Sequence, residues 1–122
     1  MILAHTSVWI DYFRSSNSHF SDLLENDRII CHELVIGELA CGNLKNRKEI
    51  LRLLNNLRNI EPASFHETLY FIEENKLMGK GLGWVDVSLL ASTIINDCIL
   101  WTMDKRLSSA AKKLKVNYKY VQ

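Results

Sequence analysis

Residues 1–13, MILAHTSVWIDYF, pair a short apolar run with an amphipathic segment, and this order decides the predicted fold. Residues 2–4 are typical of a short buried strand. Ser7 is a good helix N-cap, and the apolar and aromatic residues that follow it at helical spacing predict a helix over 7–13. The predicted strand therefore ends at a histidine, His5, where the chain turns into a helix.

The same alternation of strands and helices recurs along the chain. Further strands are expected at 28–31, 59–61, 99–102 and 118–121, and further helices at 18–26, 32–42, 46–57, 65–78, 85–96 and 105–114. This alternation favours parallel pairing, with helices on both faces of the sheet. The length of 122 residues suits one domain. We therefore predict an α/β fold, a single three-layer α/β/α domain over residues 1–122 with a mostly parallel central sheet.

The composition is that of an ordinary globular protein with an uneven charge distribution. Hydrophobic residues make up 48% of the chain, and no apolar run approaches the length of a membrane span. Three cysteines, an odd number at loose spacing, favour a reducing cytoplasmic location over a disulfide framework. Residues 104–122 carry six Lys or Arg and one Asp, so this segment is basic while the whole chain has a net charge of +1. A basic segment of this kind indicates either contact with a polyanion or a solvated helix face.

Candidate functional residues follow the predicted strands. In parallel sheets, ligands bind outside the carboxyl ends of the strands. His5 directly follows the strand at 2–4, and Asp104 follows the strand at 99–102, so neighbouring strands would place both side chains in one crevice. Asp86 opens an apolar helix, and Glu38 lies within another. Carboxylates beside apolar faces need a reason, because a lone buried charge is costly.

Each acid also has a simple structural interpretation. Asp86 and Asp104 lie at helix starts, where capping and the helix dipole favour them, and Glu38 has the option of bending into solvent. Gathered in one crevice, however, three carboxylates would repel one another unless a cation neutralised them. Oxygen ligands select Mg²⁺ or Mn²⁺, and a site of this kind suits attack on a phosphodiester.

Four sequence blocks then point to a known family. They are MILAHTSVWID at 1–11, ELVIGELACG at 33–42, GLGWVDVSLLAS at 81–92 and LWTMDKRL at 100–107. In this order, and in a chain of this size, they resemble the PIN-domain ribonucleases, specifically the VapC toxins of type II toxin–antitoxin pairs. The resemblance covers essentially the whole chain. It implies a Mg²⁺- or Mn²⁺-dependent endoribonuclease that cuts single-stranded or looped RNA.

The resemblance also assigns roles to individual residues. Glu38, Asp86 and Asp104 match three of the family's metal-binding and catalytic acids. Thr102 matches a hydroxyl position that often supports the site, and Thr6 with its neighbour Ser7 matches the small polar residues after the first acid.

His5 is a departure, because the family has an aspartate there that is usually a direct metal ligand. The leading hypothesis is that His5, still counted among the catalytic and metal-binding positions, impairs the nuclease. Neutral imidazole lacks the negative charge of a carboxylate, and Mg²⁺ accepts it less well than Mn²⁺ does. The alternatives are a natural variant in which His5 hydrogen-bonds a neighbouring acid, and a zinc site that combines histidine with Cys31, His32 and Cys41. A catalytically silent module that binds antitoxin or RNA is the alternative function.

Further residues are candidates for binding partners. Lys105 and Arg106 follow Asp104 and are the best candidates for contacts with RNA phosphates, although surface positions explain them equally well. Trp84, beside Asp86, is a candidate for base stacking or for packing. Apolar helices within 34–57 suggest a homodimer or a groove for a partner helix. The resemblance likewise implies a homodimer and a cognate antitoxin.

Overall fold

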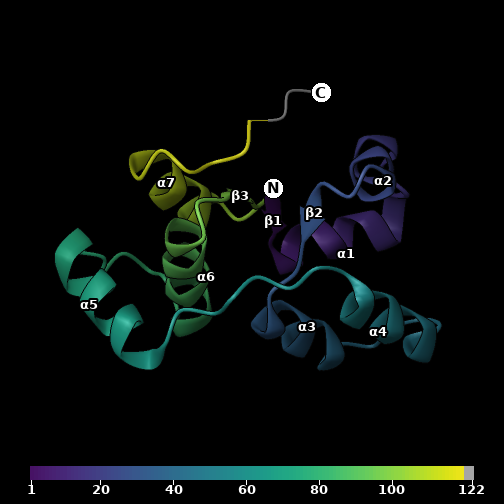
Figure 1. The fold of residues 1–122 in the computed structure, drawn as a ribbon, viewed down its shortest axis with the longest axis horizontal. Helices are drawn as coiled ribbons and strands as arrows, with labels where there is room; N and C mark the ends of the chain where they lie inside the picture. Colours follow the sequence, from purple (N-terminus) through teal and green to yellow (C-terminus); the bar gives the residue numbers. More distant parts are fainter. Residues whose placement is uncertain (120–122) are drawn as a thin grey trace.

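The computed structural model describes residues 1–119 and shows short strands separated by helices (Figure 1). In chain order the elements are β1 (Ile2–Ala4), α1 (Thr6–Ser15), α2 (Ser18–Glu25), β2 (Ile29–Ile30), α3 (Glu33–Ala40), α4 (Arg47–Asn56), α5 (Phe65–Asn75), α6 (Trp84–Ile95), β3 (Ile99–Trp101) and α7 (Lys105–Lys113).

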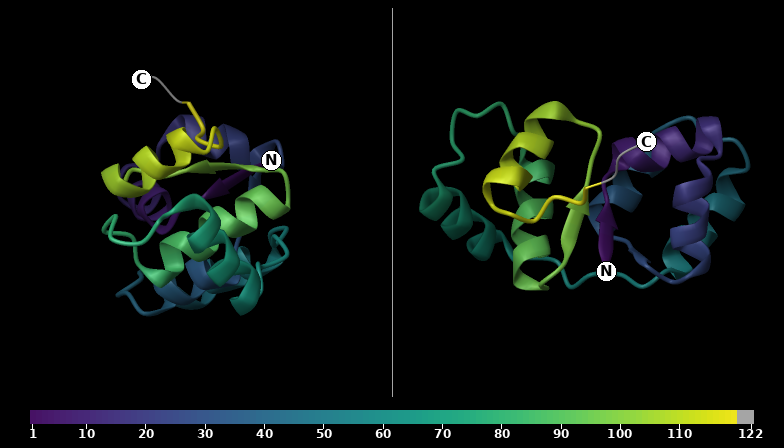
Figure 2. Two further views of the ribbon diagram at one scale, coloured as in Figure 1. Left: turned by 90° about the vertical axis from the view of Figure 1, so that its left-hand side faces the viewer. Right: turned by 90° about the horizontal axis from the view of Figure 1, so that it is seen from above.

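The sheet is parallel and has the strand order β2-β1-β3. Leu3 in the central strand pairs with Ile30 on one side and Leu100 on the other. Isolated parallel bridges, Cys31 with Asn59 and Leu100 with Asn117, continue the pairing at the two edges. Figure 2 shows α7 on one side of β3 and α6 on the other. The predicted three-layer α/β/α fold with a parallel sheet is confirmed.

Burial on both faces explains why β1 is apolar at every position. All of its residues are buried, as expected for a parallel strand covered by helices. Trp9 of α1 and Phe20 of α2 are fully buried, and their ring centroids lie 4.8 Å apart. Trp101 of β3 joins this cluster, 5.7 Å from Phe20. Trp9 and Trp101 therefore belong to the core.

The first helix begins one residue earlier than predicted and has a different cap. His5 has an extended backbone, with φ −67° and ψ 157°, and its side chain accepts a hydrogen bond from the backbone of Ser7. Ser7 therefore lies inside α1, and the expectation that it caps the helix is wrong. His5 thus lies between β1 and α1 and forms the N-cap of the helix.

The segments predicted as strands at 59–61 and 118–121 form no strand among the described residues. Within 59–61 only Asn59 forms a bridge, although the amide of Ile60 also donates to the carbonyl of Cys31 at 2.7 Å. In the predicted strand at 118–121, Tyr118 and Lys119 belong to no strand, and the remaining residues lie outside the described part of the chain. The backbone amide of Tyr118 still donates to the carbonyl of Leu100 at 2.8 Å, so the chain follows the edge of β3.

Across residues 1–119, none of the helices combines the length and the apolar character that a membrane crossing requires.

Candidate functional site

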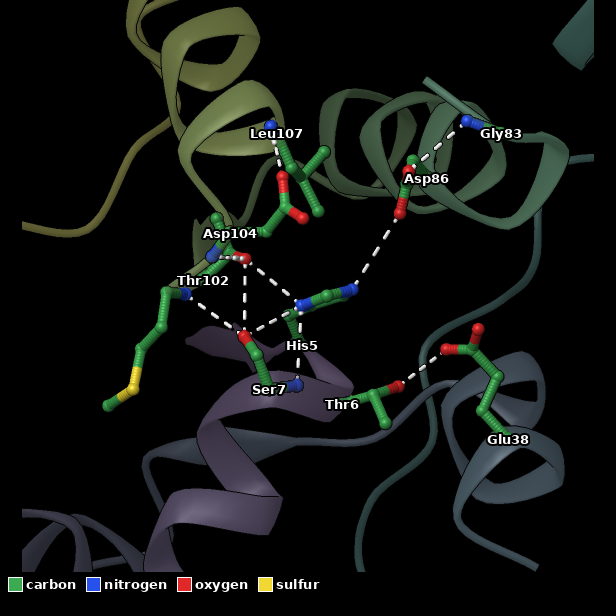
Figure 3. A network of polar contacts seen from close by, with 10 residues as sticks. His5, Thr6, Ser7, Glu38, Gly83, Asp86, Thr102, Asp104 and Leu107 are labelled. Atoms are coloured by element: carbon green, nitrogen blue, oxygen red, sulfur yellow. Dashed lines mark hydrogen bonds and ion pairs between the residues drawn. The ribbon is translucent and has the colours of Figure 1, made fainter. Parts of the chain in front are cut away.

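The site is built where the central strand ends between its two neighbours. The amide of His5 donates to the carbonyl of Trp101 at 2.8 Å, so the pairing of β1 with β3 continues to this residue. Because the two strands are parallel, their carboxyl ends meet at one edge, and the turn from β3 into α7 lies beside His5 (Figure 3). The predicted proximity of these two strand ends is confirmed.

A compact polar cluster links His5 to this turn. Its Nδ1 lies 2.8 Å from Oγ of Ser7 and 3.0 Å from Oγ1 of Thr102. The amide of Met103 donates to Oγ of Ser7 at 3.0 Å, and the amide of Asp104 donates to Oγ1 of Thr102 at 3.0 Å. The two hydroxyls therefore tie the start of α1 to the start of α7. Thr102 and Ser7 both contact Nδ1 of His5, and the supporting role of Thr102 stays a prediction.

Asp86 and Asp104 reach the site from the first turns of two helices. Oδ2 of Asp86 accepts a hydrogen bond from the amide of Gly83 at 3.2 Å, and its Oδ1 lies 3.7 Å from Nε2 of His5. Oδ1 of Asp104 accepts from the amide of Leu107 at 2.9 Å, which makes Asp104 the N-cap of α7. The capping role and the placement beside the site are therefore both real for these two acids.

Glu38 approaches from the opposite side, on α3. Its Oε1 accepts a hydrogen bond from Oγ1 of Thr6 at 2.6 Å, and its side chain is exposed (Figure 3). Thr6 is the first residue of α1, so this bond ties α3 to the helix that His5 caps. It also holds the exposed Glu38 carboxylate beside the start of α1.

His5 is the electrostatic centre of the three acids. Burial lowers the pKa of His5, while the negative charges of Asp86, Glu38 and Asp104 act in the opposite direction, and the net result is a pKa below 6.5. The imidazole is therefore neutral at neutral pH. Because Nδ1 accepts the Ser7 amide, the single proton belongs on Nε2, the atom that faces Asp86.

The donor chemistry suits a hard divalent cation, but the side chains are not assembled into a metal site. Among residues 1–119, no three His, Cys, Asp or Glu side chains converge closely enough to hold a metal ion. The physical reason is that each acid is already anchored, two at helix N-termini and one at a threonine hydroxyl. Asp104 and Glu38 each keep one carboxylate oxygen outside these bonds.

The zinc alternative is wrong. Cys31 is fully buried, and among residues 1–119 it is not part of any group of His, Cys, Asp or Glu side chains that could hold a metal ion. The ring of His32 is occupied at both nitrogens, by the amide of Leu34 and by Oγ of Ser92, each at 3.0 Å. Cys41 lies exposed beyond the end of α3.

The two basic candidates lie beside the site but do not enter its hydrogen-bond network. Lys105 and Arg106 are the exposed first residues of α7 and line a groove on its flank. Lys76, Lys80 and Lys113 line the same groove, although no sequence motif indicates them as RNA contacts. The glycine-rich connection at 79–83, between α5 and α6, and the basic helix α7 form the walls of this groove, and neither segment alone indicates it. Trp84, at the start of α6, is 42% exposed.

Comparisons with known proteins identify the family to which this fold belongs. The PIN domain family matches residues 2–113. Ribonuclease VapC32 from two strains of Mycobacterium tuberculosis is 43% identical over 111 residues, which is 90% of each chain. The crystal structure of PAE2754 from Pyrobaculum aerophilum superposes with a TM-score of 0.61 over 93% of this chain and 85% of that one; at 16% identity it supports the fold alone. The chain therefore belongs to the PIN domain family, and its likeness to VapC ribonucleases extends over nine-tenths of its length.

Proposed function

We propose that this chain is the toxin of a type II toxin–antitoxin pair and an endoribonuclease that hydrolyses RNA phosphodiester bonds. The observation that carries the proposal is the gathering of Glu38, Asp86 and Asp104 around position 5, in a chain 43% identical to a VapC ribonuclease over 90% of both lengths. PIN-domain ribonucleases generally depend on a divalent metal ion, and VapC toxins generally pair with a VapB antitoxin and act on RNA.

In this proposal the metal is Mg²⁺ or Mn²⁺, held by Glu38, Asp86, Asp104 and the residue at position 5. Such an ion activates water and stabilises the charge on the phosphoryl oxygens. The protein's own contribution is the orientation of the carboxylates. The amide of Gly83 holds Asp86, the amide of Leu107 holds Asp104, and Thr6 holds Glu38.

We further propose that His5 reduces the activity of this form. A neutral imidazole with its proton on Nε2 offers neither the charge nor the lone pair that a carboxylate would present toward Asp86. Protein sites for Mg²⁺ favour oxygen ligands, whereas Mn²⁺ accepts imidazole more readily. We therefore expect more residual activity with Mn²⁺ than with Mg²⁺.

The proposal includes an antitoxin, a homodimer and a cytoplasmic location. Exposed apolar side chains support a protein interface, but they lie mainly outside 34–57, the region the sequence analysis favoured. On α5 and α6 they include Phe65, Tyr70 and Ile95, which are 60%, 67% and 51% exposed, and a groove of about 470 Å³ lies between the two helices. The odd number of cysteines favours a reducing compartment.

A catalytically silent binding module is the second candidate function. His5 is the observation that favours it, because it occupies the centre of an otherwise complete set of acids. Such a module would keep its affinity for antitoxin or RNA and would lack hydrolysis with any divalent ion.

RNA cleavage by this chain and by His5→Asp, each with Mg²⁺ and with Mn²⁺, separates the two functions. We expect His5→Asp to cut RNA with either metal and the unmodified chain to cut weakly or only with Mn²⁺. His5→Asn is the matched control, because it has the size of aspartate without its charge. A failure of His5→Asp to cut while it binds RNA would favour the binding module.

A further inference from the structure

A basic groove runs along α7 on the side that faces the connection between α5 and α6. It encloses about 370 Å³ and is lined by five cationic side chains, those of Lys76, Lys80, Lys105, Arg106 and Lys113. No carboxylate lines it, and Leu77, Leu82 and Leu114 contribute apolar surface. The groove is thus a concentrated positive surface on a chain whose net charge is only +1.

The charges of this groove are available to a ligand. All five cationic residues are exposed. In the part of the chain that the structure describes, two basic side chains lie within 4.0 Å of a carboxylate. They are His5 beside Asp86 and Arg58 beside Asp27, and neither lines the groove. Five like charges that form no contact with a described carboxylate within 4.0 Å repel one another, and a polyanion would relieve that repulsion.

The groove is also shaped by a close contact between α7 and the glycine-rich connection. A Cβ atom on Gly81 would lie 2.6 Å from Nη1 and 2.9 Å from Cδ of Arg106. Gly81 has φ +78°, so it combines a left-handed backbone with the space that the guanidinium occupies. The side chain of Arg106 is therefore seated against this backbone as part of the groove wall.

One end of the groove meets the acids of the site. Lys105 and Arg106 directly follow Asp104, the N-cap of α7. On the other wall, Leu82 directly precedes Gly83, whose amide is bonded to Asp86. Figure 3 shows Asp86 and Asp104 at the starts of their two helices, on either side of His5. A chain lying in the groove would thus lead to the position between these acids.

We infer that this groove binds the sugar-phosphate backbone of single-stranded RNA beside the scissile bond. The inference rests on the proposed ribonuclease function and assigns Lys76, Lys80 and Lys113, together with the two cations at the start of α7, to the phosphates. Its continuity with the acids favours the substrate over an acidic protein segment. Phosphate contacts of this kind supply affinity without reading sequence.

Two matched triple variants of the full chain test the assignment. The groove variant is Lys76→Gln with Lys80→Gln and Lys113→Gln. The control variant is Lys112→Gln with Lys115→Gln and Lys119→Gln, which line a different pocket beside α7. Both remove three positive charges. Each set includes one lysine on α7, which is Lys113 in the groove variant and Lys112 in the control. Each also includes one lysine with a positive φ, which is Lys76 at 51° in the groove variant and Lys115 at 61° in the control.

Binding of a fluorescein-labelled, mixed-sequence RNA 20-mer is measured by anisotropy in EDTA, over a range of salt concentrations. We expect the groove variant to bind about tenfold or more weakly at low salt, and the slope of log K against log salt to shrink by about 2, as for three lost single-strand phosphate contacts. We expect the control variant to bind within about twofold of the unmodified chain.

Equal losses in both variants, or a loss only in the control, would overturn the inference. So would a groove variant that keeps its RNA affinity but no longer binds an acidic 20-residue peptide, because the partner would then be a protein. Circular dichroism confirms that both variants fold. The binding assay contains no metal and measures no cleavage, so a negative result would not contradict the proposed nuclease activity. Conversely, a lack of cleavage by His5→Asp would not contradict RNA binding by the groove.

Discussion

Nε2 of His5 lies 3.7 Å from Oδ1 of Asp86, longer than a hydrogen bond, so the two side chains are held by their own backbone partners and not by each other. The amide of Ser7 orients the imidazole, and the amide of Gly83 orients the carboxylate. A substitution at position 5 should therefore leave Asp86 in place, because the Gly83 amide holds its carboxylate.

The affinity for Mg²⁺ should depend on the residue at position 5. We expect 5 mM Mg²⁺ to raise the Tm of His5→Asp, because a ligand that binds only the folded state stabilises it, by about 2.7 kcal/mol at a hundred times Kd. We expect the unmodified chain and His5→Asn to respond little. Differential scanning calorimetry with and without EDTA measures this. Equal shifts in all three proteins would contradict the assignment of position 5 to the metal.

Thr102 should contribute to stability through its hydroxyl. Thr102→Val removes the partner of both His5 Nδ1 and the Asp104 amide, and we expect the free energy of unfolding to fall by about 1 kcal/mol or slightly more. Thr102→Ser keeps the oxygen and should lose less. Urea denaturation compares the variants. A valine variant as stable as the serine variant would show that these bonds are energetically neutral.

His32 should make stability depend on pH. Nδ1 accepts from the Leu34 amide, so the ring is neutral with its proton on Nε2, directed at Ser92. Burial lowers the pKa of His32 below 6.5, with Glu33 acting in the opposite direction. Below pH 6.5 the unfolded chain therefore binds more protons than the folded one. Stability should fall as the pH drops from 6.5 toward the folded pKa, with a slope of at most about 1.4 kcal/mol per pH unit.

His32→Asn provides the control, because asparagine keeps an N-cap acceptor for α3 and does not titrate. His5 also has a lowered pKa, so the unmodified chain carries both contributions. The difference between the pH profiles of the two proteins, from urea denaturation at pH 5 to 8, isolates the contribution of His32. Parallel profiles would contradict the prediction.

Alanine variants at Gly79 and Gly81 distinguish the effect of backbone strain from the effect of displacing Arg106. Gly79 and Gly81 have φ +70° and +78°, so alanine at either should cost about 1–2 kcal/mol of stability. At Gly81 the new methyl group also displaces the guanidinium, whereas nothing lies within 4 Å of a Cβ on Gly79. We expect Gly81→Ala to bind the RNA 20-mer several-fold more weakly than Gly79→Ala. Equal affinities would show that the contact between the Arg106 side chain and Gly81 does not contribute to RNA binding.

The sheet was predictable because its signals are local. Apolar runs of three or four residues, each followed by a polar residue and a helical pattern, indicate buried parallel strands. The pairing of β1 with β3 then brought His5 next to Thr102, as expected from strand ends that share an edge. The N-cap of α1 was misassigned because serine is the commoner cap, whereas histidine capping depends on a ring oriented by Ser7 and Thr102.

The side-chain arrangement of the site was less predictable, because it depends on contacts between distant segments. Whether Glu38 turns toward the site depends on Thr6, which lies 32 residues away in the chain. The basic groove likewise arises from the packing of α7 against the glycine-rich connection, where Arg106 meets Gly81. No periodicity within either segment carries that information.

Three helices begin at this edge of the sheet: α1 at His5, α6 beside Asp86 and α7 at Asp104. The amino end of a helix carries partial positive charge, so the ends of α6 and α7 favour Asp86 and Asp104, which lie on them. Backbone amides thus place Asp86 and Asp104 without a bound ion, unlike in a zinc finger, where the ion itself drives folding. In the proposed function, the metal would therefore bind to carboxylates whose backbone contacts form without it.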